Sequence, residues 1–171
     1  MAPLRRRSSF TPPPTALERQ LVPIVSTMLA ALFPIVPLVA EVPLLPPLGL
    51  LVFLGWRLLR PEVWPLWMGL PLGLWDDLAS GQPLGSAMFG WTLAMLALDL
   101  LDQRLGFRTQ LQDWGIAALL VAANLLIALA FVRVGGGATP VFMLVPQLVI
   151  AALAWPVVTR TCAALDRWRR V

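Results

Sequence analysis

Histidine and lysine are absent from this 171-residue sequence, and cysteine occurs only once, at Cys162. Without histidine, the chain lacks the commonest general base and the commonest metal ligand in proteins. A single cysteine allows no intrachain disulfide, and no cluster of cysteine and histidine can be assembled. We therefore expect no metal centre and no cofactor. We also predict that the chain is not an enzyme, because no Ser/His, Glu/His or clustered-acid core can be built.

Charge is also scarce. Only 13% of the residues are charged, against about 25% in a typical soluble domain, and 58% are hydrophobic, with a mean hydropathy of +0.79. Most of the surface must then face something other than water, and lipid is the simplest candidate. The net charge is +4, and the thirteen basic residues are all arginines that lie between long apolar runs. This placement favours contact with membrane lipids and argues against nucleic acid, which needs a clustered basic face.

Six apolar segments follow one another along the chain, and they predict an all-α integral membrane protein, a bundle of about six transmembrane helices. A straight spanning helix needs about 20 apolar residues. The first, fifth and sixth segments meet this length, whereas the second and third are short and form either thin spans or a re-entrant pair. The segments are 21–40, 44–59, 63–79, 84–101, 114–132 and 140–159.

The arginines alternate between connections in the way that six crossings require. Cytoplasmic loops carry an excess of positive charge. The N-terminal tail, the second and fourth connections and the C-terminus hold every arginine except Arg133. We therefore predict a disordered, basic, Pro-rich cytoplasmic tail over residues 1–20, a six-helix transmembrane domain over 21–160 and a basic cytoplasmic tail over 161–171.

Tryptophan and proline add two expectations. Indole rings prefer the membrane interface, so we expect Trp56, Trp64, Trp114, Trp155 and Trp168 near cytoplasmic edges and Trp75 near an outer edge. Proline removes a backbone hydrogen bond and kinks a helix, and the freed carbonyl needs another partner in lipid. Kinks are expected at Pro34, Pro37, Pro65, Pro71, Pro146 and Pro156.

A stripe of small residues marks the third segment. Gly69, Gly73 and Asp77 recur every four residues and so share one helix face. Glycines at this spacing let another helix approach closely. The approaching helix is either a neighbour in the same bundle or a helix of a partner protein, and alanine at position 73 is expected to be milder than leucine. Gly81 and Gly85 continue the spacing into the following loop.

Polar residues elsewhere have structural explanations. Asn124 and Gln147 lie within spans, where we expect hydrogen bonds between helices. A charged group near the cytoplasmic end of the fourth segment is expected to form an interfacial cluster of ion pairs, in preference to a metal or proton site; it contains Asp99, Asp102, Arg104 and Arg108.

The sequence resembles the MreD family, the small membrane subunit of the bacterial rod-shape and cell-elongation machinery. The resemblance covers most of the hydrophobic region and is densest from Pro47 to about Leu101. Its most specific part is the spacing of the third segment and its loop. The residues that carry it are Pro47, Trp56, Pro61, Gly69, Gly73, Asp77, Gly81, Leu84, Gly85, Ala87, Trp155 and Pro156.

This resemblance implies a non-catalytic scaffold in the bacterial cytoplasmic membrane. Such a protein binds an MreC-like single-pass partner and supports peptidoglycan synthesis by linking the MreB filament to RodA and its class B penicillin-binding protein. The partner-binding residues are then expected to be Gly69, Gly73, Asp77, Gly81 and Gly85. The family fold is similar to the substrate-binding subunits of energy-coupling-factor transporters, so a vitamin-type binding subunit is the alternative function.

Overall fold

The computed structural model describes residues 16–33, 45–104 and 108–168, and every regular element in these ranges is helical. Of the predicted disordered tail over residues 1–20, residues 1–15 lie outside the described ranges, whereas 16–20 form the first turn of a helix. The prolines Pro34 and Pro37 and residues 169–171 lie outside the described ranges as well. The helices are α1 (Ala16–Ala31), α2 (Leu48–Leu59), α3 (Gly69–Ser80), α4 (Ser86–Arg104), α5 (Gln110–Val134) and α6 (Leu144–Trp168), with short 3₁₀ turns η2 (Pro61–Val63), η3 (Leu66–Met68) and η4 (Val141–Met143).

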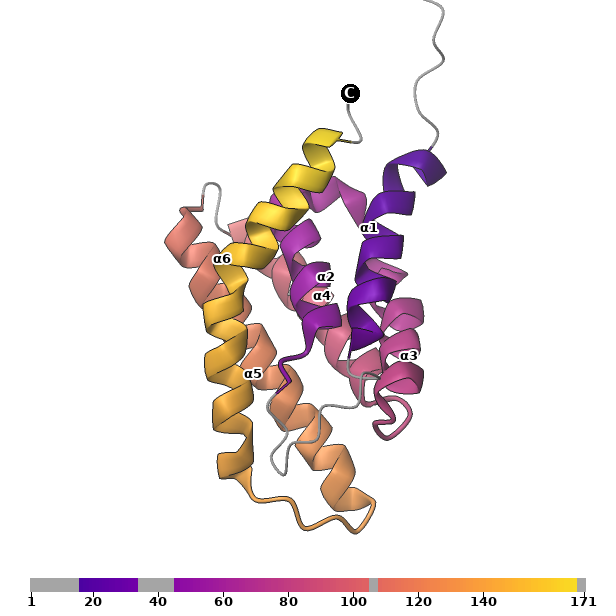
Figure 1. The fold of residues 1–171 in the computed structure, drawn as a ribbon, viewed down its shortest axis with the longest axis vertical. Coiled ribbons are helices and arrows are strands. Elements are labelled where there is room, and N and C mark those ends of the chain that lie inside the picture. Colours follow the sequence, from indigo (N-terminus) through magenta and orange to yellow (C-terminus); the bar gives the residue numbers. More distant parts are fainter. Residues whose placement is uncertain (1–15, 34–44, 105–107, 169–171) are drawn as a thin grey trace, which may run out of the picture.

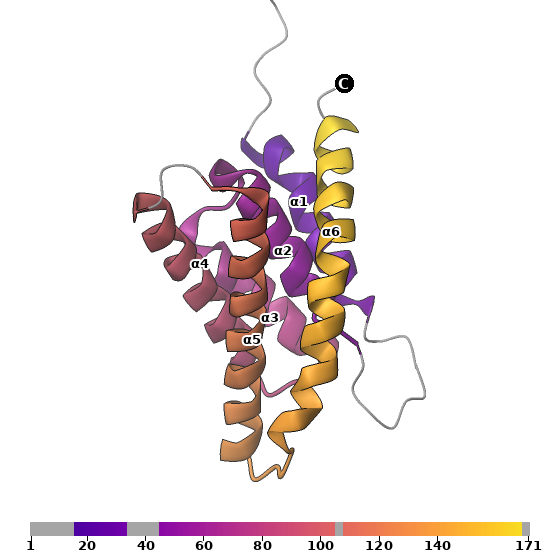
Figure 2. The ribbon, with the colours of Figure 1, turned by 90° about the vertical axis from the view of Figure 1, so that its left-hand side faces the viewer.

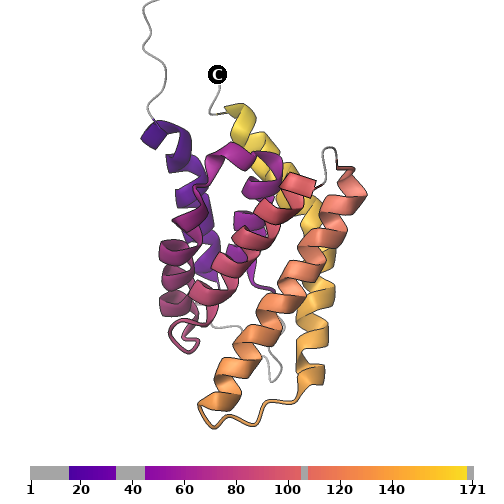
Figure 3. The same cartoon turned by 180° about the vertical axis from the view of Figure 1, so that it is seen from behind.

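Successive helices run in alternate directions along the long axis of the bundle (Figure 1 and, from behind, Figure 3). The N-terminal end of α1 and the C-terminal end of α6 consequently lie at the same end of the molecule (Figure 1). The last turns of α2 and α4 and the first turn of α5 lie at this end too, which we call the charged end because ion pairs join them there.

The short helix α2 forms the centre of the core. It packs against α1, α5 and α6 (Figure 2), and Leu50, Phe53 and Trp56 on it are fully buried. The ring of Phe53 lies between two indoles, with centroid distances of 5.4 Å to Trp64 and 4.9 Å to Trp91. Aromatic contacts of this kind add about 0.5–1.5 kcal/mol beyond area burial.

Two helical segments, Gln110–Val134 and Val141–Trp168, are long and apolar enough to cross a membrane. Only 28% and 17% of their most apolar stretches are buried inside the protein. The core helix of a soluble protein would be mostly buried, so these exposed apolar faces fit a lipid environment. The helices α2 and α3, with 12 residues each, rise only about 18 Å, less than the roughly 30 Å of a hydrocarbon core.

Most of the described prolines begin helices, and the expectation of kinks was wrong for three of them. Pro65 directly precedes η3, while Pro71 and Pro146 lie in the first turns of α3 and α6. The first N–H groups of a helix have no intrahelical acceptor, so proline removes no bond there. Within the described ranges, only Pro23 and Pro156 lie beyond the first turn of a helix.

Pro156 confirms the expectation that a freed carbonyl finds another partner. Proline has no N–H to donate to the carbonyl four residues earlier, which belongs to Ala152. The indole Nε1–H of Trp114, on α5, donates to that oxygen at 2.9 Å. The two longest helices are therefore joined at the point where α6 loses a backbone bond, and α6 changes direction part-way along its length (Figure 1).

The tryptophans divide into two groups that the sequence did not separate. Trp114 and Trp168 are 39% and 73% exposed, as interface residues should be, but Trp56, Trp64 and Trp155 are buried. The indoles of these three fill the core, which the sequence did not predict, whereas their place near the cytoplasmic edge stays a prediction. The N–H of Trp56 donates to the Ser26 hydroxyl, and that of Trp64 to the Phe53 carbonyl.

Candidate functional site

The glycine stripe of α3 packs against α4 of the same chain. A Cβ added at Gly73 would lie 2.6 Å from the Cα of Met88, and one added at Gly69 would lie 2.9 Å from the backbone nitrogen of Thr92. Real Cβ atoms do not approach backbone this closely, so glycine is required at both positions. Internal packing, one of the two explanations left open by the sequence, accounts for these two glycines.

Asp77 is fully buried and caps the first turn of α4 from the neighbouring helix. Its carboxylate accepts hydrogen bonds from the backbone N–H groups of Gly85 at 2.8 Å, Ala87 at 2.9 Å and Met88 at 3.3 Å. The Ser86 hydroxyl donates to it at 2.9 Å. A helix N-terminus has unpaired N–H groups and a partial positive charge. Asp77 satisfies both requirements, so it fixes the α3–α4 hairpin.

The turn between α3 and α4 has a different character. Gly81 ends α3 with a φ of 68°, and Gly85 has a φ of 97°, both in the left-handed region that favours glycine. A Cβ at Gly81 would meet nothing within 4 Å, and Leu84 between them is 67% exposed. Of the five predicted partner-binding residues, Gly81 is exposed and Gly85 partly exposed, whereas α4 covers Gly69 and Gly73.

Asp76, beside the cap, is also buried but points elsewhere. Its Oδ1 lies against the start of α2, 2.8 Å from where a Gly49 Cβ would be. Asp76 and Asp77 consequently serve different neighbours, as their roughly 100° separation on a helix predicts. Their different contacts agree with the prediction that Asp77, and not Asp76, lies on the same face of α3 as Gly69 and Gly73.

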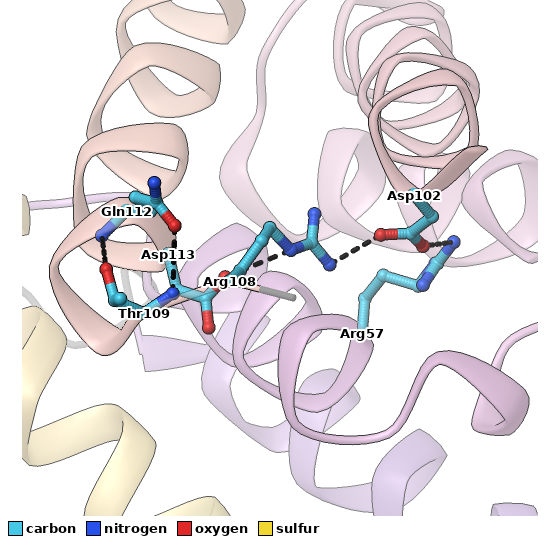
Figure 4. Close-up of polar contacts among 6 residues, drawn as sticks. All are labelled: Arg57, Asp102, Arg108, Thr109, Gln112 and Asp113. Atoms are coloured by element: carbon cyan, nitrogen blue, oxygen red, sulfur yellow. Dashed lines mark hydrogen bonds and ion pairs between the residues drawn. The ribbon is translucent and has the colours of Figure 1, made fainter. Parts of the chain in front are cut away.

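A network of ion pairs joins three helices at the charged end (Figure 4). Asp102 lies near the end of α4 and forms one ion pair through each of its two oxygens. One is with Arg57 of α2, at 2.8 Å, and the other is with Arg108, at 2.5 Å. Arg108 in turn lies 3.3 Å from Asp113, in the first turn of α5. Arg57 is 5% exposed, so its charge depends on Asp102 for compensation.

A capping box holds Arg108 in place. Thr109 is the N-cap of α5: its backbone N–H donates to the Gln112 side chain at 2.9 Å, and its hydroxyl accepts from the Gln112 N–H at 3.4 Å (Figure 4). Such reciprocal bonds fix the chain entering a helix. Arg108, one residue earlier, is thereby directed between α4 and α5.

The predicted charge cluster is confirmed in part. Asp102 and Arg108 pair as expected, but Asp99 accepts a hydrogen bond from Gln103, and no ion pair of Arg104 occurs within the described ranges. The sequence did not indicate Arg57, whose partner is two helices away. A second pair missed in the same way joins Arg60 to the buried Asp166 of α6 at 3.1 Å.

Within the described ranges, Asn124 and Gln147 do not make the interhelical hydrogen bonds that we expected. The Oδ1 of Asn124 is buried against Gly90 of α4 and has no hydrogen-bond partner among the described residues. Gln147 is half-buried, and no hydrogen bond of its side chain is found in the same part of the chain. Gly90 supplies the space that the Asn124 amide occupies, which explains the close α4–α5 contact.

The fold and these contacts define a helical membrane protein whose buried polar groups mainly hold its helices together. The chain belongs to the rod shape-determining protein MreD family, whose model matches residues 17–162. No curated protein and no solved structure matches significantly. The similarity to substrate-binding subunits of energy-coupling-factor transporters therefore stays a prediction.

Proposed function

We propose that this protein is a non-catalytic scaffold subunit of the bacterial cell-elongation complex. The family match, which covers nearly all of the helical region, carries this proposal. Two carboxylates support it, because the buried Asp77 caps α4 and the partly buried Asp102 pairs with two arginines. These groups are already engaged in holding the bundle. A scaffold needs such rigidity in order to present fixed surfaces to its partners.

The proposed orientation places both termini in the cytoplasm of a bacterium, with the bundle in the inner membrane. The helices alternate in direction, and the charged end contains Arg57, Arg60 and Arg108, consistent with the positive-inside rule. Arg160 lies near the same end, beside Leu59 and Gln110. The turn after α2 is at this end as well, which favours two thin spans over a re-entrant pair. Residues 1–20 and 161–171 are then cytoplasmic tails on either side of the 21–160 domain.

The proposed partner is an MreC-like single-pass protein, and through it RodA, the class B penicillin-binding protein and the MreB filament. Gly69, Gly73 and Asp77 would contribute by setting the shape of the hairpin. Direct contact would fall on its turn, where Gly81 and Gly85 hold an open loop and Leu84 is exposed. An exposed leucine at such a turn can make van der Waals contact with an approaching helix, and such packing contributes to helix association in membranes.

The test combines complementation with co-purification. In rod-shaped cells depleted of their own family member, the full chain should restore rod shape and retain an MreC-like partner during purification from native membranes. Leu84→Gln should reduce the partner recovered while leaving the membrane level normal. Val134→Gln is the matched control, because Val134 is an exposed apolar residue at the same end, on α5.

Two results would contradict this function. One is a failure of the abundant wild-type protein to restore rod shape or to retain any MreC-like partner. The other is equal partner recovery from Leu84→Gln and Val134→Gln, which would remove the turn as the contact. Recovery of energy-coupling ATPase subunits in place of elongation proteins would support the vitamin-type alternative.

A further inference from the structure

A cavity of about 250 Å³ opens beside the ion-pair network, between the ends of α2 and α6 and the start of α5. A water molecule takes about 30 Å³ in the liquid, so this space accommodates far more than a single ion. Its lining differs from side to side. Gly55, Leu58 and Trp155 form an apolar wall, whereas Asp113 and Arg160 provide opposite charges.

The charged groups of the cavity retain unused binding capacity. Asp113 lines the cavity, and its Oδ1 is buried and paired with Arg108 at 3.3 Å. Within the described ranges its Oδ2 has no hydrogen-bond or ion-pair partner, so this second oxygen is left for a donor in the cavity. Arg160 is exposed and forms no ion pair within the part of the chain that the structure describes. Thr159 and Gln110 add a hydroxyl and an amide to the same lining.

We propose that this cavity binds the headgroup of a zwitterionic phospholipid with a primary ammonium, that is, an ethanolamine phospholipid of the leaflet at the charged end. Arg160 would hold the phosphate, because guanidinium forms strong hydrogen bonds to phosphate oxygens. The ammonium would donate to Asp113. Asp113 disfavours a free phosphate or a purely anionic headgroup, because its carboxylate repels them.

The position of the cavity selects lipid over a soluble zwitterion. Arginines mark this end as a membrane interface, and α5 and α6 carry exposed apolar side chains toward the bilayer centre, with Leu119 and Leu153 each 70% exposed. A headgroup in the cavity leaves its acyl chains beside these helices. This inference requires that the protein lies in a membrane, but it does not depend on the proposed role in cell elongation.

The test is lipid retention by the purified full-length protein, measured by native mass spectrometry. The probes are phosphatidylethanolamine, phosphatidylcholine and phosphatidylglycerol with identical acyl chains. Choline has no N–H to donate, so the ethanolamine lipid should be retained about tenfold better, the ratio expected of one charge-assisted hydrogen bond. Equal retention of these two lipids by the wild-type protein would overturn the proposal, and this comparison needs no variant to fold.

Variants then assign the two charges. Asp113→Asn should reduce ethanolamine-lipid retention to the choline-lipid level, and Arg160→Gln should weaken both zwitterionic lipids. Asp99→Asn and Arg104→Gln are the controls, since both lie near the charged end but do not line the cavity. Preference for phosphatidylglycerol, or unchanged selectivity in Asp113→Asn, would show that Arg160 attracts anions without a headgroup site and would refute the assignment.

Discussion

Asp77 illustrates how a single carboxylate can join two membrane helices. It accepts hydrogen bonds from three backbone N–H groups and one hydroxyl at the start of α4. Few other side chains could replace it, because only an ionised carboxylate offers several strong acceptors to a positive helix end. Its importance is thus expected to be structural first, and functional through the hairpin that it fixes.

We predict that Asp77→Ala lowers the free energy of unfolding by about 2–4 kcal/mol, because buried N–H groups lose a charged acceptor. Thermal unfolding of the purified protein and its membrane level would measure this. Asp77→Asn should be milder, since one amide oxygen still accepts. Asp99→Ala is the control, and equal stability of the Asp77→Ala and Asp99→Ala proteins would contradict the capping role.

Gly73 gives a second prediction at this scale. Its added Cβ would meet the α4 backbone, which cannot move like a flexible side chain. Both Gly73→Ala and Gly73→Leu should therefore destabilise the protein, by about 1–3 kcal/mol for alanine and more for leucine. The ranking expected from the sequence, with alanine milder than leucine, is kept, but the α4 backbone already occupies the space that the alanine methyl would need.

The control is Gly115→Ala on α5, where the added methyl meets nothing within 4 Å and helix propensity improves. Membrane abundance and partner recovery should be measured together. A Gly73→Leu protein with normal abundance that loses its partner would restore the partner-groove explanation and contradict internal packing.

At the scale of elements, α5 and α6 are joined by a hydrogen bond from the Trp114 indole to the Ala152 carbonyl. This bond replaces the backbone hydrogen bond that Pro156 removes from α6. We predict that Trp114→Phe destabilises the protein by about 1 kcal/mol, because the Ala152 carbonyl loses its donor. Pro156→Ala restores an N–H that can bond to the same carbonyl. In a double-mutant cycle, Trp114→Phe should thus cost less in the Pro156→Ala background. Strictly additive effects on the unfolding temperature would contradict this compensation.

A second prediction at this scale concerns the ion pairs that join α2, α4 and α5 at the charged end. Asp102→Asn would leave Arg57 buried without a counter-charge, at a cost of about 3–5 kcal/mol. Adding Arg57→Met should recover much of that loss, because the uncompensated charge is then removed. Asp99→Asn serves as the control in the same unfolding assay. If the double variant were no more stable than Asp102→Asn alone, the ion pair would not be the source of the loss.

At the scale of the whole molecule, the alternation of helices and arginines predicts six crossings. Reporter fusions after Gly81 and Gly136 should report the outside, and fusions after Arg60 and at the C-terminus should report the inside. Both turns are at the end opposite the charged end (Figure 1). A cytoplasmic signal at Gly81 would reduce the fold to four crossings and contradict the proposed orientation.

The arrangement of the six helices and their polar contacts shows which features of this molecule can be predicted from its sequence. Apolar runs and arginine spacing indicated the six helices, because lipid imposes length and composition on each segment. The pairing of Asp102 with Arg108 was predictable because these residues are close in the chain. Arg57 was missed because its partner is distant. The burial of Trp56 and Trp64 was not predicted, because composition alone does not distinguish an indole that packs in the core from one that faces lipid.

The burial of Arg57 bears on how the chain is assembled during synthesis. Proteins are made from the N-terminus, so α2 reaches the membrane before α4 supplies Asp102. Until then, its arginine must remain with water or lipid headgroups, and α2 cannot take its central position. We therefore expect the first hairpin to reach its final position only after α4 has entered the membrane and supplied Asp102.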